Sequence, residues 1–228
     1  LNAAPLAFDA STIEIWGPLL NGGVVAIWTG HSGDLLGMAE FVAKTEANQC
    51  WLTTAVFNLM VDTFPDFFSP MSTVMTGGDV VSIDHVRRVM SEHPSLTIVN
   101  GYGPTENTVF TACEVMPPGS PPEGQSVSIG RPVRGTQIQI VDDQGRLLPR
   151  GAFGNLVVRG EGLALGYLEG SGGPEVIGGF SRFDATGGVE YRTGDYARWT
   201  AAGTLEFGGR KDSQVKLSGH RIELTAIE

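Results

Sequence analysis

The chain has 228 residues, of which 41% are hydrophobic and 18% are charged. This length predicts one large domain or two unequal ones, and the composition excludes an intrinsically disordered chain. The net charge of −10 has the wrong sign for a protein that mainly binds nucleic acid or an anionic membrane surface. No apolar run is long enough to span a membrane. We therefore expect a cytoplasmic protein whose partners are neither nucleic acids nor membranes.

The first 111 residues alternate between helical and strand-like patterns. Helices are predicted after Asp9 and at 34–47, 54–62 and 82–92, and short buried strands at 24–28, 50–53, 72–76 and 95–100. Such alternation is typical of a parallel sheet covered by helices, which binds ligands where loops leave the carboxyl ends of the strands. The glycine clusters at 77–78 and 101–103 fall at such ends.

The pattern changes after the proline- and glycine-rich segment 116–124. Short strand-like runs begin at 137, 155, 189 and 204, which predicts a small antiparallel β-subdomain, and 171–179 is predicted as a surface loop. The expected fold class is therefore α/β: a mostly parallel sheet with flanking helices, followed by a small antiparallel β-subdomain. We expect an α/β subdomain at 1–124 and a β-rich subdomain at 125–209.

The segment NGYGPTEN at 100–107 follows a predicted buried strand. Its glycines let the backbone approach a ligand closely, and Tyr102 offers a flat aromatic face. The Thr105 hydroxyl can donate to a phosphate oxygen and the Glu106 carboxylate can hold Mg²⁺. The alternative interpretation is an ordinary strand-to-helix turn.

Three further motifs each have a structural alternative. Asp9 in FDAS (8–11) either caps the following helix or anchors a substrate ammonium group. Asp195 in YRTGD (191–195) suits a ribose diol, but the motif also fits an exposed β-turn. GRKDSQVKLSGHRIE (209–223) could be a charged surface hairpin. GEGLALG (160–166) misses the dinucleotide glycine spacing by one residue, and we assign it no function.

The order of FDAS, TGGD (76–79), NGYGPTE, YRTGD and GRKDSQVKLSGHRIE resembles the adenylate-forming enzyme superfamily, and most closely the adenylation domains of non-ribosomal peptide synthetases. The resemblance covers essentially the whole chain. It implies that 210–228 is the hinge and the start of a C-terminal lid. The family's upstream phosphate loop and C-terminal catalytic lysine are not among these residues, so we expect a core fragment that adenylates poorly alone.

The resemblance also implies a binding site for ATP and Mg²⁺. Tyr102 would stack beside adenine, which Gly78, Asp79 and Gly101 would border. Thr105 would contact the α-phosphate and Glu106 the metal. Asp195 would hold the ribose hydroxyls, Phe207 would pack near the base, and Arg210 would reach ribose or phosphate. Thr105, Glu106 and Arg210 would be the catalytic residues, and Asp212 matches the hinge position.

The resemblance further implies a substrate pocket that is apolar except for one acid. The aligned pocket positions are Asp9, Ala10, Ile13, Trp51, Met75, Gly77, Gly101, Val109 and Phe110. An acid at this place suits an α-amino group, whereas an acyl or aryl ligase would gain nothing from burying it. The set looks like the family's valine pockets, so valine is the predicted substrate, with isoleucine or another small branched residue next.

The implied reaction is attack of an amino-acid carboxylate on the α-phosphorus of ATP, giving aminoacyl-AMP and pyrophosphate. The acyl group would then pass to the phosphopantetheine thiol of a peptidyl carrier protein domain. Neighbouring synthetase domains are expected partners, and a small MbtH-like activator protein is a candidate one. The alternatives are an acyl-CoA ligase of the same superfamily and a nucleotide-binding scaffold without turnover.

Overall fold

A computed structural model describes residues 1–31, 33–168, 174–175, 179–182, 188–211, 214–217 and 220–223. The predicted hinge residue Asp212 lies outside these described residues. The chain forms two compact units. The first comprises Leu1–Gly101, Val115–Val127 and Lys216–His220, and the second comprises Tyr102–Glu114, Ser128–Val215 and Arg221–Glu228. The subdomain boundaries expected at 124/125 and 209/210 stay predictions.

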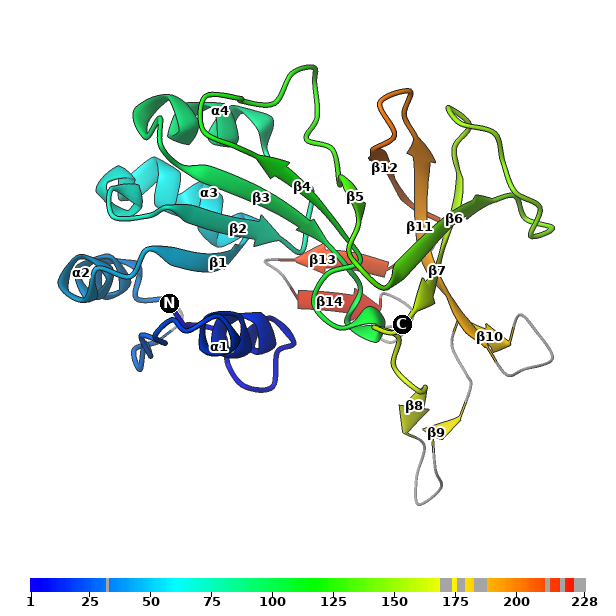
Figure 1. The fold of residues 1–228 in the computed structure, drawn as a ribbon, viewed down its shortest axis with the longest axis horizontal. Helices are drawn as coiled ribbons and strands as arrows, with labels where there is room; N and C mark the ends of the chain where they lie inside the picture. The colour runs from blue at the N-terminus through cyan, green and yellow to red at the C-terminus, as the bar shows by residue number, and fades with distance from the viewer. Residues whose placement is uncertain are drawn as a thin grey trace. The chain divides into compact units, whose positions relative to one another are not determined.

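The first unit alternates helices and strands, as the sequence predicts (Figure 1). The helices are α1 (Ala10–Leu20), α2 (Leu35–Thr45), α3 (Thr54–Thr63) and α4 (Ile83–Glu92), with a 3-10 turn, η1 (Pro65–Phe68). The strands are β1 (Gln49–Thr53), β2 (Thr73–Gly77) and β3 (Thr97–Tyr102). These strands pair in parallel, so their carboxyl ends lie at one edge of the sheet.

The two faces of this sheet have different surroundings. One face carries Cys50, Val74 and Ile98 in register, and these side chains form a core with apolar residues of α2, α3, α4 and η1. The opposite face carries half-buried side chains, including Trp51 and Met75. The helices α2, α3 and α4 therefore cover the Cys50–Val74–Ile98 face of the sheet, and the face with Trp51 and Met75 lies outside this core.

The strand expected at 24–28 is wrong. Among the residues that the structure describes, the segment makes only one isolated bridge, between Asn2 and Ile27. Val24 is 88% exposed and Ile27 is 62% exposed, so the apolar run is not buried in a sheet. Trp28 instead packs against Phe41 of α2, with ring centroids 5.4 Å apart. Hydrophobicity alone suggested a strand here, but within the described part of the chain no second strand pairs with the segment.

The five-stranded sheet has the order β1-β2-β3-β4-β5, in which β4 (Ala112–Met116) and β5 (Arg131–Pro132) pair antiparallel. The second unit holds an antiparallel sheet of the order β10-β11-β7-β6, with β12 paired to β11. Its strands are β6 (Thr136–Val141), β7 (Gly154–Gly160), β10 (Phe180–Arg182), β11 (Val189–Trp199) and β12 (Leu205–Arg210). The fold class is thus confirmed: a mostly parallel sheet with helices, and a separate antiparallel sheet.

The remaining short strands form two separate pairs. β8 (Tyr167–Leu168) pairs with β9 (Pro174–Glu175), and β13 (Gln214–Leu217) pairs with β14 (His220–Glu223). The predicted surface loop at 171–179 lies mostly outside the described residues, and β9 falls within it. Among the described residues, no helix is long and apolar enough to cross a membrane.

Candidate functional site

Three side chains from different motifs meet in the second unit. The Tyr102 hydroxyl donates a hydrogen bond of 2.5 Å to Oδ2 of Asp195. The Arg210 guanidinium donates to the other carboxylate oxygen, Oδ1, over 2.8 Å. Only 4% of Asp195 is exposed, so the carboxylate is held by two donors in a nearly dry environment. The structure thus brings together residues that the sequence placed in NGYGPTE, YRTGD and GRKDSQ.

The backbone of β11 fixes where Asp195 points. Asp195 lies directly opposite Arg210 in the β11–β12 register, so the two side chains are cross-strand neighbours. The pairing of β11 with β7 shifts between Arg192 and Tyr196, and Gly194 within this irregularity has φ of +77°. Such bulges re-aim side chains and are frequent beside active sites.

Thr193 is a residue of this cluster that the motif analysis overlooked. It is 2% exposed, donates from Oγ1 to the Leu156 carbonyl, and accepts from the Asp195 amide over 3.1 Å. Its own carbonyl accepts from Arg210. Thr193 therefore ties the bulge to β7 and to the arginine. It lies inside YRTGD, so the motif itself was the signal that could have identified it.

Tyr102 is a neutral donor at physiological pH. Burial and the adjacent Asp195 carboxylate raise the pKa of the Tyr102 hydroxyl well above its ordinary value. The Tyr102 ring lies 6.3 Å from that of Phe207, at an interplanar angle of 42°. Two aromatic faces, a buried acid and an arginine therefore occupy one region of the second unit. This combination suits a group with a flat base, hydroxyls and negative charge.

Glu106 lies in the short turn η2 (Thr105–Asn107) and is only 7% exposed, whereas Thr105 is exposed. Thr108, just after this turn, has φ of 62° and ψ of −137°. A β-branched residue at positive φ is strained, at a cost of about 1–3 kcal/mol, and such strain clusters at functional sites.

Buried Glu106 and exposed Thr105 offer the oxygen donors that a magnesium ion bound together with nucleotide would need. No group of three or more His, Cys, Asp and Glu side chains that could hold a metal occurs among the described residues. Mg²⁺ does not need one, because it usually takes one or two carboxylates along with substrate phosphates and waters. Glu106 would supply the carboxylate and Thr105 a hydroxyl for the phosphate. The bound ion would neutralise phosphate charge.

Tyr167 is a second residue that sequence reasoning missed. Its hydroxyl donates to Oε1 of Glu106, 61 residues away in the sequence. Burial, the hydrogen bond to Glu106 and the neighbouring Tyr191 all raise the pKa of Tyr167, so it too is a neutral donor. Tyr167 directly follows GEGLALG, a segment to which the motif analysis assigned no function.

In the first unit, Gly78 and Asp79 follow the carboxyl end of β2. Gly78 has φ of +86°, and apart from its chain neighbours no described residue lies within 4 Å of where a Cβ would stand, which leaves room for a ligand beside its backbone. The Thr54 hydroxyl lies within hydrogen-bond reach of the carbonyls of Gly77 and Asp79, at 3.1 and 3.2 Å. Buried Thr54 therefore fixes this turn at the sheet edge.

Four predicted pocket residues share one face of the parallel sheet. Trp51 is paired with Met75, and Gly77 is paired with Gly101 two positions further along the strands. Because side chains alternate between faces, residues 51, 75, 77 and 101 all face the same way. Val99 pairs with Met75 and belongs to the same face, so it joins this group although the motif alignment did not include it.

The other predicted pocket residues lie elsewhere in the chain. Asp9 immediately precedes α1, and Ala10 and Ile13 lie in its first turns; α1 contacts β1, the strand that carries Trp51. The Asp9 side chain makes no helix-capping hydrogen bond, so the structure gives no support to the capping interpretation. Val109 and Phe110 are half-buried residues of the second unit, between η2 and β4.

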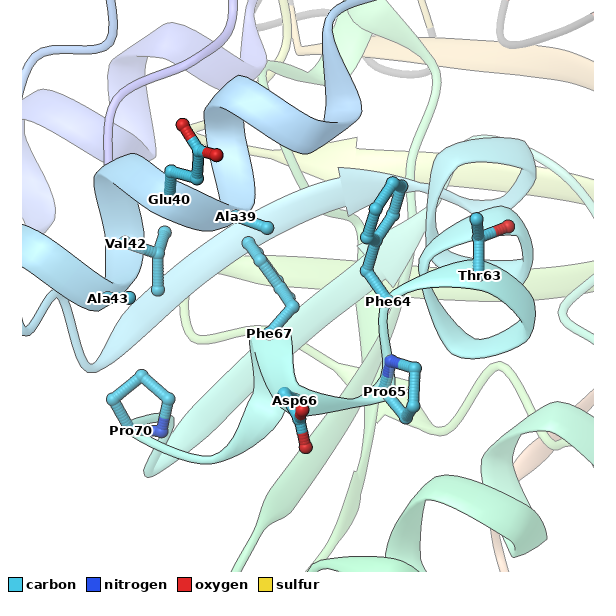
Figure 2. Close-up of a pocket in the computed structure, with 10 residues that line it drawn as sticks. All are labelled: Ala39, Glu40, Val42, Ala43, Thr63, Phe64, Pro65, Asp66, Phe67 and Pro70. Carbon is cyan, nitrogen blue, oxygen red and sulfur yellow. The ribbon is translucent and has the colours of Figure 1, made fainter.

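A separate groove of about 310 Å³ lies between α2 and η1 in the first unit (Figure 2). Figure 2 shows Phe64 and Phe67 beside Ala39 and Val42, with the acids Glu40 and Asp66 at different sides of the groove. None of the predicted substrate or nucleotide residues lines it. The groove is therefore a feature of the helical layer and lies apart from the candidate site.

Comparison with known proteins decides the family. The model of the AMP-binding enzyme family matches residues 1–168. The chain belongs to this family. It is 41% identical over its whole length to a linear gramicidin synthase of Brevibacillus parabrevis, and 35% identical to surfactin synthase subunit 3 of Bacillus subtilis. The resemblance found in the motifs is thus confirmed.

A solved member of the same group provides the structural counterpart. PA1221, described as a non-ribosomal peptide synthetase protein containing adenylation and carrier domains, superposes with a TM-score of 0.89 at 40% identity over the whole chain. The chain spans 46% of that solved protein, 3% of the linear gramicidin synthase and 18% of surfactin synthase subunit 3. The chain therefore corresponds to part of an adenylation domain.

Proposed function

We propose that these residues form the core of an adenylation domain that activates an amino acid as aminoacyl-AMP for non-ribosomal peptide synthesis. The observation that carries this proposal is the cluster of Tyr102, Asp195 and Arg210, with Phe207 beside it. Residues far apart in sequence converge there on one buried acid, held by donors at 2.5 and 2.8 Å.

In the proposed reaction, the substrate carboxylate attacks the α-phosphorus of ATP. A bond forms between the carboxylate oxygen and phosphorus, the bond to the pyrophosphate oxygen breaks, and pyrophosphate leaves with the electron pair. This chemistry needs positioning and charge stabilisation, and it needs no side-chain nucleophile. Asp195 would orient the ribose hydroxyls, Arg210 and Thr105 would contact oxygens of the nucleotide, and Glu106 would hold Mg²⁺.

The predicted substrate is valine or a similar branched amino acid. The shared face of Trp51, Met75, Val99, Gly77 and Gly101 supports an apolar wall with both bulk and space. Asp9 would pair with the substrate ammonium group, because it directly precedes α1, which contacts the strand that carries Trp51. A pocket discriminates a single methylene by only about 1–3 kcal/mol, so isoleucine should be activated as well.

The proposed acceptor of the acyl group is the phosphopantetheine thiol of a carrier protein domain. This proposal is supported by the solved relative, whose description names both an adenylation and a carrier domain. Neighbouring synthetase domains are proposed as further partners because the chain spans so little of the gramicidin and surfactin synthases. A small MbtH-like activator protein is a further candidate partner, and the assay should be run with and without it.

The test is ATP–pyrophosphate exchange on a complete adenylation module that contains these residues, with panels of amino acids and fatty acids. Exchange led by valine or isoleucine is the expected result. Exchange with fatty or aryl acids alone would instead identify an acyl ligase and overturn the role of Asp9. Nucleotide binding without exchange, with and without the activator, would identify a scaffold.

A further inference from the structure

The segment 160–167, which we call the clamp segment, contacts the turn that carries Glu106 at three places. The Thr108 hydroxyl donates to the Gly162 carbonyl over 2.8 Å, and the Ala164 amide donates to the Glu106 carbonyl over 2.8 Å. The Tyr167 hydroxyl donates to the Glu106 carboxylate. The clamp segment therefore holds both the backbone and the side chain of Glu106.

From these contacts we propose that Tyr167 is a positioning residue that orients the Glu106 carboxylate toward the metal of bound nucleotide. The inference rests on the proposed function, in which Glu106 is the metal ligand. A carboxylate has two oxygens; with Oε1 engaged by the phenol, the carboxylate cannot rotate freely. Hydrogen bonds of this kind to a ligating group commonly fix its orientation and tune its affinity for the metal.

Neighbouring aromatic rings hold Tyr167 in the position from which it contacts Glu106. Its ring packs edge-on against Phe180, with centroids 5.7 Å apart at 73°, and Phe180 packs against buried Tyr191 at 4.7 Å. These ring contacts anchor the phenol to residues of β10 and β11 and restrict where its hydroxyl can lie. The strained backbone of Thr108 is likewise held by its bond to Gly162.

Glycine at 162 allows the clamp segment to lie close to the turn. A Cβ at this position would stand 2.9 Å from the side-chain oxygen of Asn107, the residue next to Glu106. GEGLALG does not have the glycine spacing of a dinucleotide-binding loop, but it does contact the turn that carries Glu106. Its small residues let the clamp segment lie closely against the η2 turn.

The test compares Tyr167→Phe with Tyr196→Phe in a complete adenylation module. Tyr167→Phe removes one hydroxyl and keeps the ring that contacts Phe180. Tyr196→Phe removes a phenol hydroxyl from the same unit; the Tyr196 ring lies 5.8 Å from the Lys211 ammonium and has no proposed role in the site. The probe is Mn²⁺, whose binding in the presence of ATP is measured by electron paramagnetic resonance without any turnover.

Tyr167→Phe should weaken Mn²⁺ binding about tenfold or more, while metal-free ATP binding and the melting temperature stay near those of Tyr196→Phe. In a Glu106→Gln background, Tyr167→Phe should have no additional effect, because the group that it orients is gone. Unchanged Mn²⁺ affinity in Tyr167→Phe, or fully additive losses in the double variant, would overturn the positioning role. Failure of the unmodified module to bind Mn²⁺ with ATP would overturn the nucleotide site itself.

Discussion

The Tyr102 hydroxyl and the Asp195 carboxylate form a 2.5 Å hydrogen bond between residues 93 positions apart. Both are at least nine-tenths buried, so neither group has water as a ready substitute partner. The bond joins the end of β3 to the bulge in β11, and Arg210 completes the set from β12. One buried acid thus connects three of the motifs from which the family resemblance was drawn.

Replacing Tyr102 with Phe should therefore destabilise the protein. The variant leaves Oδ2 of Asp195 buried without its donor, which costs about 1–3 kcal/mol. The loss should appear in the free energy of unfolding measured with urea. When Asp195 is already replaced by Asn, adding Tyr102→Phe should cost less free energy of unfolding than it costs in the wild-type protein, because a buried amide without a donor is less unfavourable than a buried carboxylate without one. Equal penalties in both backgrounds would mean that the bond is not what stabilises this region.

Replacing Asp9 can distinguish its two possible roles, which are to anchor the substrate ammonium group and to cap α1. Asp9→Ala should raise the amino-acid KM about 10-fold or more in the exchange assay, because a charge-assisted bond contributes about 1.5–3 kcal/mol. The ATP KM should change little, because the proposed role of Asp9 is limited to the amino-acid substrate.

The matched control is Asp34→Ala at the start of α2. Asp34 does cap its helix, accepting from the Gly37 amide over 2.9 Å. This variant should lose about 0.5–2 kcal/mol of stability and keep the wild-type amino-acid KM. If Asp9→Ala behaved like Asp34→Ala, with lost stability and unchanged KM, the anchoring role would be rejected.

The helices α1 to α4 and the strands β1 to β3 could be predicted because their apolar residues repeat with the period of one secondary structure. Prediction failed at 24–28, where the apolar run forms one isolated bridge, between Ile27 and Asn2, and not a strand. It also missed β4, whose five residues, Ala112–Met116, have no clear alternation. A short strand depends on the neighbours that it pairs with, and those neighbours are not encoded locally.

In the candidate site, too, residues with a local sequence signal could be predicted, and residues placed by contacts with distant segments could not. Tyr102, Asp195 and Arg210 could be identified because each belongs to a motif. Tyr167 could not, since its role arises from a contact across 61 residues. Val99 joins the Trp51–Met75 face through strand register, which no spacing in the sequence reveals. Tyr167 and Val99 were missed because their places depend on how segments pack, whereas Thr193 lies inside a motif and could have been identified.

Glu14 should make stability depend on pH. It is 4% exposed on α1, and Oε2 accepts from the Asn2 side chain and from the amides of Ala3 and Ala4. Desolvation nevertheless dominates and raises the pKa of Glu14 in the folded protein above its value of 4.5 in the unfolded chain.

A raised folded-state pKa means that the folded protein binds the proton more tightly. The stability linked to Glu14 is therefore fully present below its unfolded pKa and is lost as pH rises through its folded pKa. The Glu14→Gln variant carries no titrating group, so its free energy of unfolding should fall less steeply than that of wild type above pH 4.5. Parallel curves for the two proteins, measured by urea unfolding at several pH values, would contradict the assignment.

Gly77 should tolerate no side chain. A Cβ there would stand 2.1 Å from the carbonyl oxygen of Gly101, its partner in the β2–β3 register, and backbone cannot move aside as a flexible side chain can. Gly77→Ala should therefore cost about 1–3 kcal/mol or more in the free energy of unfolding, as overpacking does. Gly33→Ala is the control, because apart from its chain neighbours no described residue lies within 4 Å of the Cβ position at Gly33. Gly77→Ala should also narrow the space beside Met75, so any residual exchange activity should shift from valine toward alanine. Wild-type stability in Gly77→Ala would show that the strands can separate at this end, and the proposed apolar wall of the pocket would then not be rigid.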